Sequence, residues 1–174
     1  MRRRLTVLMA AATLAWAGLA HAKLPRDVDE FRERLAKEAV KPEGAAKLWF
    51  EAIYVYAKDA SRDEGRKMLA LLMLDEKWEK NTYFVDRMRT KPHIYRSYAK
   101  GSTPENRYAM DPDSFALVVA SSAKDKFREH GWRLTLKSGG DDEPRPLVLV
   151  KGTDNLWRIQ AYNEVYGDIK PPAG

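Results

Sequence analysis

His93 is the side chain best suited to acid–base chemistry in this sequence. It follows Pro92, and an imidazole titrates near neutral pH, as a general base must. A base also needs an orienting partner, and Asp86 and Asp111 are the carboxylates we consider for that role. The alternative, which we favour, is a loop histidine that hydrogen-bonds to a backbone carbonyl. His130 precedes Gly131 and fits a turn between strands.

A second group of side chains could hold an anionic or polar ligand. Residues 94–99 are predicted to form a strand, in which Arg96 and Tyr98 point to the same side. If that side faces a cavity, the guanidinium and the phenol suit a carboxylate or phosphate. In the alternative, Arg96 points outward and Tyr98 packs over its stem.

The turn-rich stretch 101–113 and the triplet around Arg145 add further candidates. Tyr108 could cover a pocket, whereas Asn106 suits a tight turn or the cap of a strand. Arg145 lies between two prolines, which would aim it rigidly at an anion. Structural roles are favoured for all three, with Arg145 bridged to Asp141 or Asp142 at the start of an edge strand. The predicted ligand-binding residues are therefore Arg96, Tyr98, Asn106, Tyr108 and Arg145.

The composition argues against a metal site or a bound cofactor. The chain has no cysteine, and only two of its three histidines lie after residue 22. The acidic run 141–143 lacks the alternating oxygen spacing of a calcium loop. No glycine-rich phosphate loop, serine nucleophile elbow or zinc-protease helix is present. We predict neither metal nor cofactor.

The charge is too small to indicate nucleic-acid binding. Three of the positive charges behind the formal net charge of +6 are Arg2, Arg3 and Arg4, in a segment without acidic residues. Removing them leaves about +3 for residues 23–174, mixed evenly with acids.

Residues 1–22 have the three parts of a cleaved signal peptide. The three arginines precede an apolar stretch, residues 5–19, and Ala20-His21-Ala22 forms a small-x-small cleavage site before Lys23. The alternative is a retained membrane anchor, but the apolar core of about 15 residues is shorter than the ~20 that a spanning helix needs. We predict export to the periplasm or the extracellular space, with no membrane span after cleavage.

Residues 23–174 are of a length typical of one domain. Capping boxes at Asp27 with Glu30 and at Ser61 with Glu64 predict two helix starts, and Pro42 suits the first turn of another helix. That helix should run to about residue 60, with Trp49 and Ile53 on one face. In the third, Met68, Leu69, Leu72 and Met73 should point inward.

The second half is predicted to be a β-meander. After residues 94–99, strands are expected at 115–120, 132–136, 147–150 and 157–162, joined by short turns that favour antiparallel pairing. The end, residues 171–174, should be a loose tail. Helices followed by a meander indicate an α+β fold in which a curved, cone-like sheet packs on the N-terminal helices.

This order resembles the nuclear-transport-factor-2-like (SnoaL-like, cystatin-like cone) fold. The closing hairpin, residues 149–151 and 156–159, looks like the last two strands of such domains, which often form homodimers through the outer sheet face. Residues 97–101, 104–108 and 138–146 resemble an uncharacterised family of bacterial domains of unknown function. The cone fold hosts isomerases, dehydratases, hydrolases and binding modules, so the resemblance implies a fold rather than an activity.

Three functions follow as hypotheses. The first is an exported, non-catalytic domain that binds a small ligand or a protein of the bacterial envelope, because the candidate side chains are donors and aromatics without an evident acid–base pair. The second is a small hydrolase, isomerase or dehydratase that uses His93 with Asp86 or Asp111. The third is a protein-interaction module, such as an inhibitor of an envelope enzyme.

Overall fold

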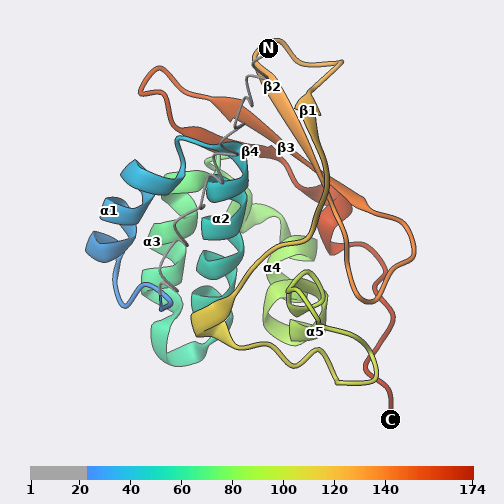
Figure 1. Ribbon diagram of the computed structural model, residues 1–174. Helices are drawn as coiled ribbons and strands as arrows, with labels where there is room; N and C mark the ends of the chain where they lie inside the picture. Colours follow the sequence, from blue (N-terminus) through green and yellow to red (C-terminus); the bar gives the residue numbers. More distant parts are fainter. Residues whose placement is uncertain (1–22) are drawn as a thin grey trace, which may run out of the picture.

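The computed structural model describes residues 23–174 (Figure 1). The predicted signal peptide lies outside the described residues. Within them, helices occupy the first half and a sheet the second, so the α+β prediction is confirmed. No described helix combines the length and the apolar character needed to cross a membrane.

Three longer helices and two short ones form the helical part of the domain. They are α1 (Val28–Glu38), α2 (Pro42–Ala57), α3 (Arg62–Leu72), α4 (Thr82–Thr90) and α5 (Pro92–Arg96). Asp27 caps α1 as predicted, because its carboxylate accepts from the backbone N–H groups of Asp29 and Glu30. Ser61 precedes α3 at its N-cap position, as predicted, but its side chain makes no capping hydrogen bond and donates to the Val55 carbonyl instead.

The sheet is a four-stranded antiparallel meander in the order β1-β2-β3-β4. Its strands are β1 (Val119–Lys124), β2 (Gly131–Leu136), β3 (Arg145–Lys151) and β4 (Trp157–Ala161). The sheet is open rather than closed into a barrel. Helix α2 packs against β2 and β4 (Figure 1), which places the predicted Trp49/Ile53 face in the core.

The first predicted strand is wrong, because residues 92–96 form helix α5. Pro92 lies in its first turn, where a fixed φ and a missing N–H fit a helix start. Ile94 and Tyr95 are buried, and the Ser97 hydroxyl closes the last turn by donating to the Ile94 carbonyl at 2.6 Å. A single antiparallel bridge between Ala99 and Leu117 is the only strand-like pairing of that segment within residues 23–174.

Pro146 lies in a strand that has neighbours on both sides, so the edge-strand prediction needs correction. β3 is central, but its pairing with β4 begins at Val148, while Arg145 and Pro146 pair with β2 alone. The missing N–H of Pro146 is therefore tolerated where the strand is locally an edge.

The start of β1 also differs from the prediction. The strand begins at Val119, several residues after the predicted start at residue 115.

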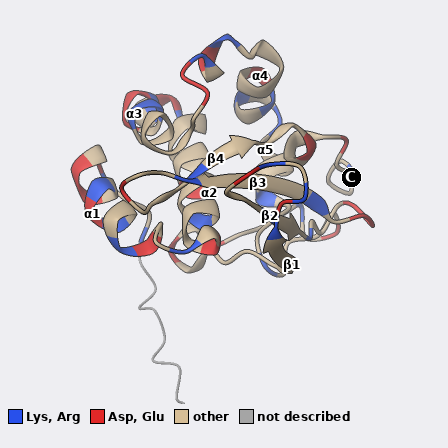
Figure 2. Ribbon diagram, turned by 90° about the horizontal axis from the view of Figure 1, so that it is seen from above, with Lys and Arg blue, Asp and Glu red and all other residues tan. Residues whose placement is uncertain are grey.

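The C-terminal segment, predicted to be loose, is tied to the body. The Lys170 N–H donates to the Gly140 carbonyl at 3.0 Å, and the Ala173 N–H donates to the Pro104 carbonyl at 2.9 Å. Blue basic and red acidic segments are interspersed over the helices and loops, and the strands are largely uncharged (Figure 2).

Candidate functional site

His93 has no carboxylate partner among the described residues. Its ring lies 5.9 Å from that of Tyr108, centroid to centroid. Burial lowers the pKa of His93, and the nearby Lys91 and Arg87 lower it further, against a hydrogen bond to the Ile169 backbone. The imidazole is therefore neutral near pH 7. A neutral imidazole bonded to a backbone group matches the structural role that the sequence favoured, although His93 lies in the first turn of α5 rather than in a loop.

The two carboxylates considered as partners of His93 serve local backbone structure instead. Asp86 is exposed on α4 and accepts from the Thr90 hydroxyl at 3.4 Å. Asp111 caps a short 3-10 turn, where it accepts from the Asp113 N–H and the Ser114 hydroxyl. The structure does not bring either to His93 as an ion pair.

Arg96 and Tyr98 do not form the predicted donor pair, because no strand is present to align them. Arg96 ends α5, with its guanidinium 5.9 Å from the centre of the Tyr54 ring. Tyr98 is fully buried, and its hydroxyl donates to the Val165 carbonyl at 2.6 Å. Burial raises the pKa of Tyr98, so the phenol stays protonated as a donor.

Asn106 and Tyr108 hold their loop together. The Asn106 amide oxygen accepts from the Thr103 and Ala109 N–H groups, and its Nδ2 donates to the Gly101 carbonyl at 2.8 Å. Tyr108 is buried rather than poised as a cover, and its hydroxyl donates to the Lys170 carbonyl at 2.6 Å. The positive φ angles fall on Arg107 and Tyr108 rather than on Asn106.

Arg145 is engaged by Asp141, as the structural alternative predicted. The ion pair raises the pKa of Arg145. Burial of the Asp141 carboxylate raises its pKa, but the hydrogen bond from the Glu143 N–H and the pairing with Arg145 outweigh this effect and lower it. The guanidinium lies beside Gly167, since a Cβ there would be 3.4 Å from Nη1. Together with His93, Tyr98 and Tyr108, Arg145 therefore lies against the chain's own segment 165–170.

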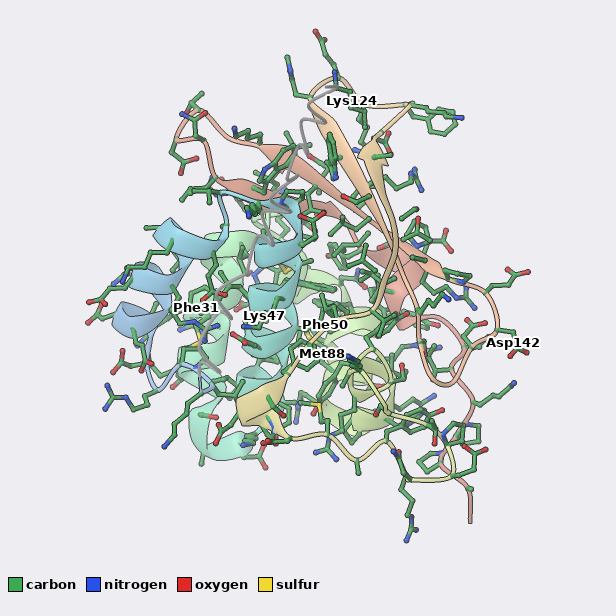
Figure 3. The ribbon with its side chains drawn as sticks, in the orientation of Figure 1. Phe31, Lys47, Phe50, Met88, Lys124 and Asp142 are labelled. Atoms are coloured by element: carbon green, nitrogen blue, oxygen red, sulfur yellow. The ribbon has the colours of Figure 1, made fainter. Side chains whose placement is uncertain are left out.

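The space between the helices and the C-terminal segment is nearly filled. The cavity there has a volume of about 10 Å³, close to the space of a single water molecule. Side chains of α2, α4, α5 and the turn at 163–166 line it, among them Phe50 of α2 and Met88 of α4, which are labelled in Figure 3. Trp49 Nε1 and Arg87 Nε, both buried in this lining, have no partner within residues 23–174. This interior is too small for the ligand that the cone-like fold suggested.

A larger recess opens at the outer end of β4. It has a volume of about 550 Å³ and is mostly polar; its lining is Leu74, Asp75, Asn81, Arg128, Gln160, Ala161, Tyr162 and Asn163. β4 supplies Gln160 and Ala161, and Tyr162 and Asn163 follow it directly, while the 74–81 segment runs beside β4, with the Leu74 N–H donating to the Ile159 carbonyl at 3.0 Å. Its polar groups converge from segments that are distant in the sequence.

Hydrogen bonds fix one side of this recess. The Tyr162 hydroxyl lies 3.4 Å from Asp75 Oδ2. Tyr166 donates to Asn163 Oδ1 at 2.9 Å and accepts from Asn81 Nδ2 at 3.0 Å. Burial raises the pKa of Tyr162 to about 12, so its hydroxyl remains a donor at all physiological pH values.

The other side carries polar groups that the protein itself does not use. Among the described residues, neither the Gln160 amide nor the Arg128 guanidinium has a hydrogen-bond or ion-pair partner. The recess thus offers amide, guanidinium, phenol and carboxylate groups at one place. It does not have the geometry of a metal site, because residues 23–174 contain no group of three or more His, Cys, Asp or Glu side chains that could hold a metal ion. Sequence reasoning missed it because Gln160, Ala161 and Tyr162 belong to the predicted strand 157–162, and the residues that face them lie far away along the chain.

The fold and this recess describe a small α+β domain whose function has to be argued from its surface. Residues 23–173 match the model of the family described as a domain of unknown function, DUF6935, and the chain belongs to that family. The predicted membership in a family of unknown function is confirmed to that extent. No curated protein matches the chain, and no solved structure matches it.

Proposed function

We propose that the protein is an exported, non-catalytic module of the bacterial envelope that binds a small polar ligand in the recess beside β4. The observation that carries this proposal is that polar groups held by hydrogen bonds and polar groups without a partner lie side by side in this recess. Tyr162 and Asp75 are held in place, while the Gln160 amide and the Arg128 guanidinium point into the same recess without partners. Specificity in ligand sites arises from a few polar groups arranged in this way.

Geometry supports a binding role over a catalytic one. The acid–base alternative needs His93 beside Asp86 or Asp111, and both carboxylates are occupied elsewhere. Acid–base catalysis requires direct or water-bridged reach between its groups. The third hypothesis, a protein-interaction module, stays a prediction.

Three observations support export. The leader pattern of residues 1–22 predicts cleavage before Lys23, the family match starts at that same residue, and a chain without cysteine needs no disulfide in an oxidising compartment. An open antiparallel sheet with helices on one face is compatible with the nuclear-transport-factor-2-like fold.

The recess favours a neutral, polyhydroxylated ligand, such as a fragment of an envelope glycan. Its carboxylate and guanidinium offset one another, so neither a strong anion nor a strong cation is selected. Amide, carboxylate and phenol groups form hydrogen bonds with hydroxyl groups as both donors and acceptors. The Tyr162 ring and Leu74 supply apolar surface for the faces of a sugar ring.

The test is a thermal-shift screen of envelope sugars and glycan fragments, followed by calorimetry on the compounds that stabilise the protein. D75N and Q160A should weaken binding by about tenfold or more, since each removes a hydrogen bond worth about 1.5 kcal/mol. E76Q is the matched control, because Glu76 is the neighbouring exposed carboxylate outside the recess. Equal affinity of D75N, Q160A and wild type would refute the assignment of this recess.

A further inference from the structure

The hairpin between β1 and β2 carries a fully displayed aromatic side chain. Phe127 is 86% exposed, the highest value among the exposed large hydrophobic residues of the described chain. Exposing a phenylalanine to water is costly, and this side chain contributes nothing to the core. Figure 3 shows neighbouring Lys124 at the end of the hairpin, pointing away from the helices.

The exposure of Phe127 belongs to a well-formed turn rather than to a frayed end. Asp125 Oδ1 accepts from the Phe127 N–H at 2.9 Å, and Asp125 Oδ2 accepts from Arg133 Nε at 2.9 Å. The Asp125 N–H donates to the Gly131 carbonyl, and the Gly131 N–H donates to the Arg128 carbonyl. A Cβ at Gly131 would lie 2.9 Å from the Cβ atoms of Arg128 and Asp125, so the turn closes tightly there.

Positive charge surrounds the aromatic ring. Lys124, Lys126 and Arg128 are exposed on both sides of Phe127 in the sequence, and none forms an ion pair with another described residue. The Asp125 side chain, by contrast, is fully buried and neutralised by Arg133. Glu129 is the one exposed acid at this tip between residues 124 and 130. The tip therefore presents one apolar anchor with three unpaired cations.

We propose that this tip, residues 124–130, docks the protein on an anionic phospholipid surface, with Phe127 inserted at the interface and Lys124 and Lys126 at the headgroups. A single aromatic side chain is far too small for the apolar core of a protein–protein interface. An aromatic anchor flanked by lysines and arginines matches an anionic membrane surface, where each cation adds about tenfold or less in affinity. The inference goes beyond ligand binding in the recess and does not depend on it.

The experiment measures co-sedimentation of the protein beginning at Lys23 with two kinds of vesicle, pure phosphatidylcholine and an equal mixture of phosphatidylglycerol and phosphatidylcholine. We expect binding to the mixed vesicles only, weakening as salt is added. F127S should lower the partition coefficient by about tenfold, and the double variant K124Q/K126Q, which removes two cations, by about thirtyfold. Arg128 is left unchanged, because it also lines the recess.

Two further variants separate insertion from unspecific adhesion. Tyr83 is 51% exposed on α4, so Y83S is the matched control and should bind as wild type does. In F127W, the new indole should shift to shorter emission wavelengths with mixed vesicles and be quenched by brominated lipid. Equal binding to both vesicle types, no binding to mixed vesicles, or wild-type binding by F127S would each overturn the proposal. Capture of an envelope protein by the tip without vesicle binding would also overturn it. F127S should still bind ligands in the recess as the wild type does, so that a failure of one proposal can be distinguished from a failure of the other.

Discussion

The Tyr108 hydroxyl donates a 2.6 Å hydrogen bond to the Lys170 carbonyl, across 62 residues of sequence. Tyr98 does the same for Val165, so two buried tyrosines hold one short C-terminal segment. Several side chains that suggested a ligand site in the sequence thus bind part of the chain itself. The two tyrosine hydroxyls are hydrogen-bond donors, but each donates to a backbone carbonyl of the protein.

Y108F should therefore destabilise the protein by about 1–2 kcal/mol, because the Lys170 carbonyl loses its partner at a part-buried site. Urea unfolding measures the change, and hydrogen exchange at the Lys170 amide should accelerate, since that amide is bonded to the Gly140 carbonyl of the same contact region. Y83F, at an exposed tyrosine, is the control and should unfold as wild type. Identical unfolding of Y108F and Y83F would contradict the role given to the Lys170 contact.

Gly139 should tolerate no side chain. A Cβ there would lie 1.6 Å from the Ser102 carbonyl oxygen, so two backbone segments would have to separate. We expect G139A to cost about 3 kcal/mol or more. Gly101 is the comparison: it has a φ of +82° but nothing within 4 Å of its added Cβ, so G101A should cost only the ~1–2 kcal/mol of a left-handed alanine. Thermal unfolding of both variants checks the order, and the reverse order would contradict this account.

A buried ion-pair network joins α1 to α2. Arg34 contacts Glu51 at 2.7 Å and Glu38 at 2.7 Å, while Lys47 lies 3.3 Å from Glu51. Burial raises the pKa of Glu51, against the two nearby cations that lower it. The Glu51 carboxylate therefore depends on Arg34 for its charge.

R34A should destabilise the protein by about 3–5 kcal/mol, because it leaves the Glu51 carboxylate buried beside Lys47 alone. R34M/E51M, which removes both charges and keeps the volume, should recover much of that loss. Denaturant unfolding of the two variants makes the comparison. If the double variant were less stable than R34A, the cost of burying the unpaired Glu51 carboxylate would not be the main cause of the loss of stability in R34A.

Elements whose apolar pattern repeats several times could be predicted from the sequence, whereas elements with a single repeat could not. The Trp49/Ile53 face runs along the 16 residues of α2, and the two-residue alternation of β2 repeats at Trp132, Leu134 and Leu136. Helix α4 has nine residues, so its buried Phe84 and Met88 form only one helical repeat, and α5 has five. For such lengths a strand pattern and a helix pattern fit equally well.

The recess was not predictable for a different reason. Asp75 and Tyr162 are 87 residues apart, and no local periodicity reports a pairing over that distance. Gln160, in turn, reads as an ordinary outward-facing strand residue. Arg145 shows the opposite case, because Asp141 lies only four residues away and the ion pair could be proposed from spacing alone.

The turn between β3 and β4 should make a small, acid-sensitive contribution to stability. Asp154 forms a two-point pair with Arg158, at 2.8 and 2.6 Å. The hydrogen bond from Arg158 lowers the pKa of Asp154 to about 2, below its ordinary value of 3.8. A carboxyl whose pKa is depressed in the folded state stabilises the protein above the unfolded pKa, and that contribution disappears as the pH falls through the folded value. The window here lies between about pH 4 and pH 2.

D154N should lower the free energy of unfolding at pH 7 by no more than about 1 kcal/mol, because the Asp154 side chain is 45% exposed and solvent screens the pair. Its difference from wild type should shrink as the pH falls from 4 towards 2, since protonated Asp154 no longer pairs as an ion with Arg158. Urea titrations across this range measure the difference. D142N, at an acid exposed to 92%, is the control and should follow the wild-type pH profile. A constant difference between D154N and wild type down to pH 2 would assign the effect to the turn's hydrogen bonds rather than to the charge of Asp154.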